Sequence, residues 1–215
     1  MRLRLGVLAS GRGTNLQAMI DAIERGELDA QIVLVISNHR TAPALARAAA
    51  HGIPTKALTW ARYGSRTKQH LAMLRAFQQH GAELIVTAGF DKILVAEFVR
   101  AYAGRIVNIH PSLLPAFAGG MAPRPQAEAL AYGVKVSGCT VHIVTEELDA
   151  GPIILQAAVP VEDDDTVDTL AARILQEEHR LLPRAVQLFA EGGVQIDGRR
   201  VRIRPAPLPL GRPAG

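Results

Sequence analysis

The sequence predicts an α/β fold with a doubly wound, mostly parallel sheet, and two observations carry this prediction. Apolar runs of strand length alternate with amphipathic segments of helix length through the first half of the chain. Strands joined by helices in this rhythm run parallel and receive helices on both faces. With 215 residues, 48% of them hydrophobic, the chain can bury one substantial core.

Five strands are expected in the first half, because each segment has the near-continuous apolar character of a strand covered on both faces. They are Arg2 to Ala9, Gln31 to Ser37, Pro54 to Leu58, Glu83 to Ala88 and Arg105 to Ile109. Four helices are expected between them, at Asn15 to Arg25, Pro43 to His51, Arg66 to His80 and Leu94 to Tyr102. Pro43 suits the first turn of its helix, and Thr14 or Asn15 can cap the first helix.

The pattern changes after residue 110, and the C-terminal half is more elaborate. It should contain a Gly- and Pro-rich loop (Pro115 to Pro125), a short helix (Gln126 to Tyr132), two strands (Gly138 to Val144 and Pro152 to Val161), a long helix (Thr166 to Glu191) and a hairpin (Val194 to Ile196 with Arg200 to Ile203). No internal linker requires a boundary. One domain over residues 1–205 is therefore expected, followed by a Pro-rich C-terminal tail over residues 206–215.

Composition argues against several classes of protein. No run approaches the roughly 18 uninterrupted apolar residues of a membrane span, so we expect a cytoplasmic protein without a membrane partner. Cys139 is the single cysteine, which excludes an internal disulfide and a cysteine-based metal cluster. All of the net charge of +4 comes from residues 197–215, where five arginines face one acid, Asp197. A basic face for nucleic acid is therefore not indicated.

A Gly-rich loop, Ser10 to Asn15 (SGRGTN), lies between the first expected strand and the first expected helix. Free backbone N–H groups and the helix dipole favour an anion at such a place. No Gly-Lys-Ser/Thr follows, and Leu16 stands where a dinucleotide fingerprint needs its third glycine. A small phosphorylated substrate is therefore predicted, and a tight turn that merely needs two glycines is the alternative.

Polar residues gather where expected strands end. Asn108 and His110 are two residues apart, so they should project from the same face of their strand, and Pro111 then ends the ladder. Asp149 falls in the connection between the two later strands and could join them. An amide donor and an imidazole can stabilise an oxyanion, and a carboxylate beside the imidazole raises its pKa and orients it. This trio suits acyl or formyl transfer without a covalent enzyme intermediate.

Each residue of this trio also has an ordinary structural explanation, such as satisfying loop backbone or starting a turn. His142, on a neighbouring expected strand, is the main rival of His110. A metal site built from His110, His142 and an aspartate has no third ligand at a recognisable spacing, so no metal is predicted.

Several ordered motifs together resemble the folate-dependent phosphoribosylglycinamide formyltransferases. They are LASGRGTNLQAM (Leu8 to Met19), TAGFDKIL (Thr87 to Leu94), NIHPSLLP (Asn108 to Pro115), GCTVHIVTEELDAGPIILQ (Gly138 to Gln156) and EEHRLLP (Glu177 to Pro183). The resemblance covers nearly the whole chain. It implies a Rossmann-like sheet of the formyltransferase type and transfer of the formyl group of 10-formyltetrahydrofolate, a co-substrate, to the amine of phosphoribosylglycinamide in de novo purine synthesis.

The resemblance also implies roles for individual residues. It places Asn108, His110 and Asp149 at the reacting formyl group, with Asn108 also near the folate. The phosphorylated substrate would be held by Gly13, Thr14, Asn15 and Glu178, and the folate by Arg66, Asp91, Lys92, Ile93, Leu94, Thr145, Glu146, Glu147 and Leu148. The expected partners are these small molecules only, with the protein a monomer or homodimer.

The chain departs from the family pattern at two places and leaves alternatives open. Asp91-Lys92 stands where the family usually has Met-Arg or a similar pair, and the loop at residues 118–125 is longer than usual. The alternatives are formyltetrahydrofolate deformylase, methionyl-tRNA formyltransferase and a non-catalytic folate- or nucleotide-binding module. The first two families carry a further domain that this sequence does not show, and the third does not explain the polar trio.

Overall fold

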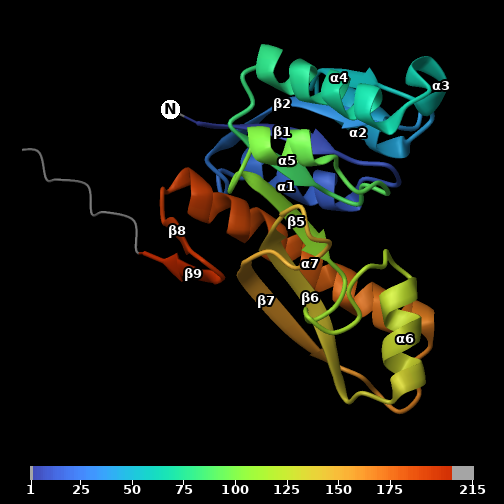
Figure 1. Cartoon of the computed structure of the whole chain (residues 1–215). Coiled ribbons are helices and arrows are strands. Elements are labelled where there is room, and N and C mark those ends of the chain that lie inside the picture. The colour runs from blue at the N-terminus through green and yellow to red at the C-terminus, as the bar shows by residue number, and fades with distance from the viewer. Residues whose placement is uncertain (1, 205–215) are drawn as a thin grey trace, which may run out of the picture.

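The computed structural model describes residues 2–204, so the expected tail over residues 206–215 lies outside the described residues. Its main feature is a seven-stranded sheet with the strand order β3-β2-β1-β4-β5-β6-β7 (Figure 1). The first five strands are parallel, while β6 pairs antiparallel with both β5 and β7. The predicted α/β fold with a mostly parallel sheet is confirmed.

The elements follow the expected order with small differences at their ends. The strands are β1 (Leu3–Leu8), β2 (Ala30–Ser37), β3 (Thr55–Ala57), β4 (Leu84–Thr87), β5 (Ile106–His110), β6 (Val136–Ile143), β7 (Ile153–Pro160) and the separate hairpin β8 (Val194–Asp197) with β9 (Arg200–Ile203). The helices are α1 (Thr14–Glu24), α2 (Pro43–Ala50), α3 (Trp60–Tyr63), α4 (Arg66–Gln79), α5 (Ala96–Ala101), α6 (Arg124–Tyr132) and α7 (Val167–Ala190). The short α3 was not predicted; it is a single turn that ends at Gly64, which has φ 61°.

Apolar side chains form one core on each face of the sheet. Leu16 and Met19 of α1 and Leu182 of α7 pack with Val7 and Val107 on one face. Phe77 of α4 and Phe98 of α5 lie with other apolar side chains on the opposite face. Helices therefore cover both faces of the parallel part, which explains why its strands are apolar throughout. In the C-terminal part of the sheet, α7 lies along β6 and β7 (Figure 1).

The chain reverses the direction of strand addition between β1 and β4, which are neighbours in the sheet. Open α/β sheets bind ligands at the carboxyl ends of strands beside such a switch point. The loop after β1 leads there into α1, whose N-cap residue is Gly13 in the left-handed region with φ 72°. A Cβ on Gly13 would lie 2.7 Å from the Cβ of Ala44, so this close approach also requires glycine.

The expected capping of α1 by Thr14 or Asn15 is wrong. The N-cap position belongs to Gly13, and no side chain caps the helix. The side chain of Asn15 turns instead towards α7, where Nδ2 donates to Glu178 Oε2 at 2.7 Å. Among residues 2–204, no helix is long and apolar enough to span a membrane.

We expect Gly6→Ala to destabilise the fold, because a Cβ there would overlap the Phe77 ring and lie 2.8 Å from Ile85 Cδ1. Overpacking of this kind costs about 1–3 kcal/mol of the free energy of unfolding. This loss can be measured by urea unfolding of the wild type, Gly6→Ala, Phe77→Leu and the double variant. The double variant should lose less stability than the sum of the single losses, since leucine leaves room for the methyl group. Strict additivity would contradict this packing.

Candidate active site

A cavity of about 570 Å³ opens at the carboxyl ends of β1, β4 and β5. Five segments contribute to its lining: residues 11–15 after β1, residues 87–94 at and after β4, residues 108–111 at the end of β5, residues 119–122 in the long loop, and residues 142, 144, 145 and 147–149 around and after the end of β6. Leu175 and Glu178 of α7 complete the lining. The cavity therefore brings together loops that are far apart in the sequence, at the switch point where a ligand site is expected.

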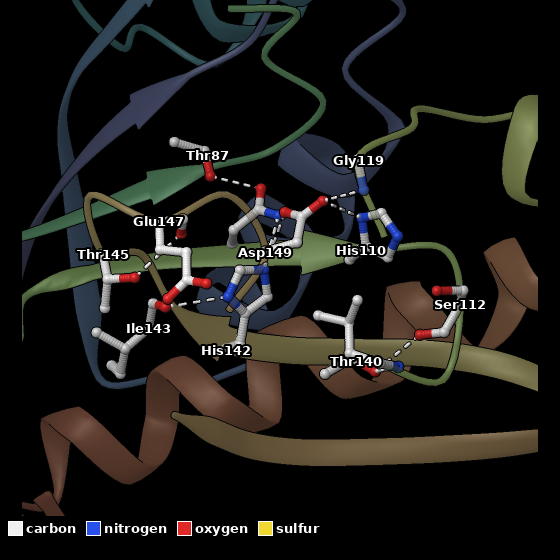
Figure 2. A network of polar contacts seen from close by, with 12 residues as sticks. Thr87, His110, Ser112, Gly119, Thr140, His142, Ile143, Thr145, Glu147 and Asp149 are labelled. Atoms are coloured by element: carbon white, nitrogen blue, oxygen red, sulfur yellow. Dashed lines mark hydrogen bonds and ion pairs between the residues drawn. The ribbon is translucent and has the colours of Figure 1, made fainter. Parts of the chain in front are cut away.

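Asn108 is flanked in the sheet by Thr87 of β4 and His142 of β6, which are its register partners. The Thr87 hydroxyl donates to Asn108 Oδ1 at 2.6 Å. Asn108 Nδ2 lies 3.1 Å from His142 Nε2. Both ends of the carboxamide are thus engaged, and one hydrogen of its NH2 group has no partner within residues 2–204. Figure 2 shows Thr87, His142, His110 and Asp149 gathered at this end of the sheet.

His142 acts here as an acceptor. Its Nδ1 lies 3.0 Å from the Ile143 carbonyl, which can only accept, so this nitrogen carries a hydrogen. Burial lowers the pKa of His142, although the Ile143 carbonyl and Asp149 act in the opposite direction. The ring is therefore neutral near pH 7, and its Nε2 lone pair receives the Asn108 amide. The predicted rival of His110 thus orients Asn108.

His110 lies between two acceptors. Its Nε2 is 3.0 Å from the carbonyl of Phe117, and its Nδ1 is 3.3 Å from Asp149 Oδ2. Only the imidazolium form can donate from both nitrogens at once. The His110 ring is almost fully buried, and the Asp149 side chain is 10% exposed, so water screens the interaction between these two side chains little. The structure brings the predicted trio together.

The loop that holds Asp149 is tightly constrained. Asp149 adopts a positive φ of 48°, and its Oδ2 accepts from the backbone N–H of Gly119 at 2.8 Å. A Cβ on Gly151 would fall onto the carbonyl oxygen of Ile143. Only glycine fits there, and it lets this loop pass close enough to β6 for the carboxylate to reach both histidines; Asp149 Oδ1 is 3.6 Å from His142 Nε2.

The side of the cavity beneath α1 is lined by Gly13, Thr14, Asn15 and Glu178. Glu178 is 7% exposed, and burial raises its pKa, although the bond from Asn15 acts against this shift. Asn15 Oδ1 is buried and has no hydrogen-bond partner within the described part of the chain. An acid and an orphaned amide oxygen therefore lie side by side and can receive donors from a ligand.

The opposite side is lined by most of the residues that the resemblance assigns to folate. Asp91, Lys92, Ile93, Leu94, Thr145, Glu147 and Leu148 all line the cavity. Two others do not. Arg66 is exposed on the first turn of α4, and Glu146 forms a two-point ion pair with Arg100 of α5, at 2.7 and 3.0 Å.

The loop of residues 88–95 has no regular structure, and His70 of α4 helps to hold it. The backbone N–H of Val95 donates to His70 Nδ1 at 3.2 Å, and the imidazole lies near the Phe90 ring. His70 is fully buried. Burial, with a smaller effect from the Arg66 charge, lowers the pKa of His70 to about 4.

Three contributors to the site were missed by the analysis of the sequence: Thr87, Phe117 and Gly119. Thr87 ends the apolar segment before the Gly-Phe loop, so a polar residue at a strand end could have indicated it. The other two act through backbone groups, for which a sequence carries no chemical signal. Within residues 2–204, no group of three or more His, Cys, Asp and Glu is arranged to hold a metal ion.

Comparison with known proteins identifies the family. Residues 3–186 match the formyl transferase family. The chain belongs to this family. It is 39% identical to the phosphoribosylglycinamide formyltransferase of Escherichia coli (strain K12), over 93% of this chain and 96% of that protein. The match confirms the predicted family.

Other relatives extend the comparison. The chain is 48% identical to the trifunctional purine biosynthetic protein adenosine-3 of Gallus gallus over 91% of its own length, and spans 19% of that longer protein. The structure of glycinamide ribonucleotide transformylase 1 from Symbiobacterium toebii is 48% identical, with a TM-score of 0.90 over 94% of each chain. A formyltetrahydrofolate deformylase from Pseudomonas syringae is 30% identical, with a TM-score of 0.87 over 94% of this chain and 66% of that one.

We expect Thr87→Val to lower kcat for formyl transfer by about tenfold, because the Asn108 carboxamide loses the donor that fixes its orientation. Valine keeps the shape of the side chain, so the fold should persist. Steady-state kinetics would measure the change, with Thr41→Val, an exposed substitution outside the cavity, as the control. Wild-type kcat in Thr87→Val would show that Asn108 does not need this bond.

The free energy of unfolding should decrease as the pH is lowered, over a range set by the pKa of His70. Its folded-state pKa of about 4 lies below the ordinary value of 6.5, so the unfolded chain binds the proton first as the pH drops. The stabilisation by the neutral ring is therefore complete above pH 6.5 and is lost as the pH falls towards 4, by about 3 kcal/mol. Urea unfolding of the wild type and His70→Gln at several pH values tests this. Parallel pH profiles for the two proteins would refute the assignment.

Proposed function

We propose that the protein transfers the formyl group of 10-formyltetrahydrofolate to the amine of N1-(5-phosphoribosyl)glycinamide, a step of de novo purine (IMP) synthesis. The observation that carries this proposal is the position of Asn108, His110 and Asp149 between the two lined sides of one cavity. One side begins at a helix N-terminus suited to phosphate, and the other is an irregular loop suited to a flat heterocycle. Membership of the formyl transferase family and the 39% identity to the Escherichia coli phosphoribosylglycinamide formyltransferase support this reaction.

The reaction needs charge stabilisation more than a nucleophile from the protein. The substrate amine attacks the formyl carbon, and the carbonyl oxygen becomes an oxyanion. The uncommitted N–H of Asn108 and an N–H of protonated His110 would donate to this oxygen. In the structure His110 Nε2 lies 3.0 Å from the Phe117 carbonyl. If Nε2 is the donor to the oxyanion, the oxyanion must replace this carbonyl as the acceptor. A negatively charged oxygen is the stronger acceptor.

Asp149 completes the proposed chemistry. Its carboxylate lies 3.3 Å from His110 Nδ1 and would orient the imidazole ring. Collapse of the tetrahedral intermediate breaks the bond to N10 of the folate, which must gain a proton while the attacking amine loses one. His110 and Asp149, with water between them and the reacting atoms, are placed to pass this proton. No metal is proposed for any step.

The substrate assignments follow the two sides of the cavity. The phosphate would bind the backbone N–H groups at Gly13, Thr14 and Asn15, and Glu178 with Asn15 Oδ1 would receive the amine and amide hydrogens of the glycinamide. Main-chain groups over residues 91–94 and Thr145, Glu147 and Leu148 would hold the folate. Arg66 and Glu146 would contribute at its exposed tail, outside the lined cavity. We propose a cytoplasmic monomer or homodimer.

Hydrolysis of the formyl group is the second candidate, because the deformylase structure shares the fold over most of this chain. In that reaction water replaces the amine as the nucleophile. The polar pair of Asn15 and Glu178 beside the phosphate loop favours the transferase, since hydrolysis needs no second substrate to be held there.

The decisive experiment follows tetrahydrofolate release from 10-formyltetrahydrofolate by the purified protein, with and without glycinamide ribonucleotide. Release that requires the ribonucleotide is expected. Release without it would establish the hydrolase instead, and no release in either case would leave a binding module.

His110→Ala should lower turnover by about 10²–10⁴-fold, since it removes both the cationic donor and the proton carrier. Equilibrium binding of glycinamide ribonucleotide should remain close to that of the wild type, because its phosphate site is built by other residues. His51→Ala, at the end of α2 and outside the cavity, is the matched control. Near-normal turnover of His110→Ala would exclude the proposed role of this residue.

A further inference from the structure

Four polar side chains meet where β1, β2 and β4 end, on the outer side of the cavity. Ser10 follows β1, Asn38 and His39 follow β2, and Asp91 lies in the loop after β4. Three of them contact the same carboxylate. Asn38 Nδ2 donates to Asp91 Oδ1 at 2.7 Å, His39 Nε2 lies 2.8 Å from Asp91 Oδ2, and the Ser10 hydroxyl is 3.2 Å from Asp91 Oδ1.

Hydrogen bonds close this cluster into a ring. The backbone N–H of Asp91 donates to Ser10 Oγ at 3.0 Å, and the Ser10 hydroxyl donates to Asn38 Oδ1 at 2.6 Å. The ring is closed by Asn38 Nδ2, which donates to Asp91 Oδ1. A further bond, from Ser10 N–H to the Gly89 carbonyl at 3.0 Å, ties the same two loops through their backbones. Since each member both donates and accepts, the ring holds its segments in one arrangement.

Side chains of the protein contact both oxygens of the Asp91 carboxylate. Its side chain is 30% exposed, and partial burial would raise its pKa, but the hydrogen bonds from His39 and Asn38 prevail and hold the pKa below its ordinary value. Both oxygens thus have donors from the protein, and Lys92 Nζ lies 3.7 Å from Oδ1. Such a carboxylate has little capacity left for a ligand, although the residue lines the cavity.

The ring joins the two halves of the substrate site. Ser10 directly precedes the loop of residues 11–15, which lines the phosphate side, and Asp91 starts the segment of residues 91–94, which lines the opposite side. We propose that Asp91 is a positioning residue that locks these two loops together through Ser10 and Asn38, so that one carboxylate sets the geometry of both substrate subsites. The identity of the two substrates rests on the proposed function; the locking of the loops does not.

A positioning role and a direct folate contact predict different kinetic effects when Asp91 is replaced. Asp91→Ala should raise KM for glycinamide ribonucleotide and for 10-formyltetrahydrofolate, each by about tenfold, with a smaller change in kcat. Asp91→Asn keeps Oδ1 for Asn38 and the backbone N–H for Ser10, so it should restore both KM values to within roughly threefold of the wild type. Ser10→Ala should reproduce the effect of Asp91→Ala on both substrates, since it opens the same ring.

Kinetics of the wild type, Asp91→Ala, Asp91→Asn and Ser10→Ala therefore test the proposal, with Glu97→Ala, an exposed acid on the next helix, as control. A KM increase confined to the folate, or an equal loss in Asp91→Ala and Asp91→Asn, would mean that the charge contacts the folate directly and would overturn the proposal. Unchanged KM values in Asp91→Ala would also overturn it.

Hydrogen exchange gives a readout that does not need turnover. In Asp91→Ala the backbone amides of residues 10–15 and 89–95 should exchange about tenfold faster than in the wild type, and in Asp91→Asn they should not. Should the wild type fail to release tetrahydrofolate, the proposed function fails while this measurement still decides the ring. Wild-type exchange rates in both loops of Asp91→Ala would refute the locking of the loops.

Discussion

One row of side chains across three strands, Thr87, Asn108 and His142, supports the rest of the site. The row exists because β5 pairs in register with β4 on one side and with β6 on the other, which places the three residues next to one another on one face. A slip of one residue in either ladder would turn the row to the opposite face. The polar contacts within the row can form because packing of the surrounding core fixes the strand register.

The change from parallel to antiparallel pairing at β5 explains how a carboxylate reaches this row. Because β6 runs opposite to β5, its end at Ile143 lies beside the start of β5, and the following loop must turn back across the ends of the strands to enter β7. In that loop Asp149 adopts a left-handed conformation, which costs an aspartate about 1 kcal/mol. The hydrogen bond from the Gly119 N–H and the contact with His110 offset this strain.

Much of this could be predicted from the sequence because it depends on local order along the chain. Apolar periodicity predicts the strands and helices, and the two-residue spacing predicts that Asn108 and His110 share a face. Thr87 could not be placed in the same way, since its contact depends on strand register over 21 residues of chain. The cap at Gly13 was also predicted wrongly, because propensity favours Asn15 as a cap while a buried acid on α7 provides its side chain with a partner.

The contacts around Asp91 show how side chains can fix the geometry of loops that line a site. Irregular loops at strand ends have no ladder of their own to fix them, so side chains must do so. Here the Asp91 carboxylate contacts two side chains that follow β2, while the backbone N–H of Asp91 donates to Ser10 Oγ after β1. Strand pairing holds Asn108 and His110 in place, whereas the loops that line the two sides of the cavity depend on a polar ring and on His70. Substitutions in that outer layer should therefore alter substrate affinity, and those in the row should alter the chemical step.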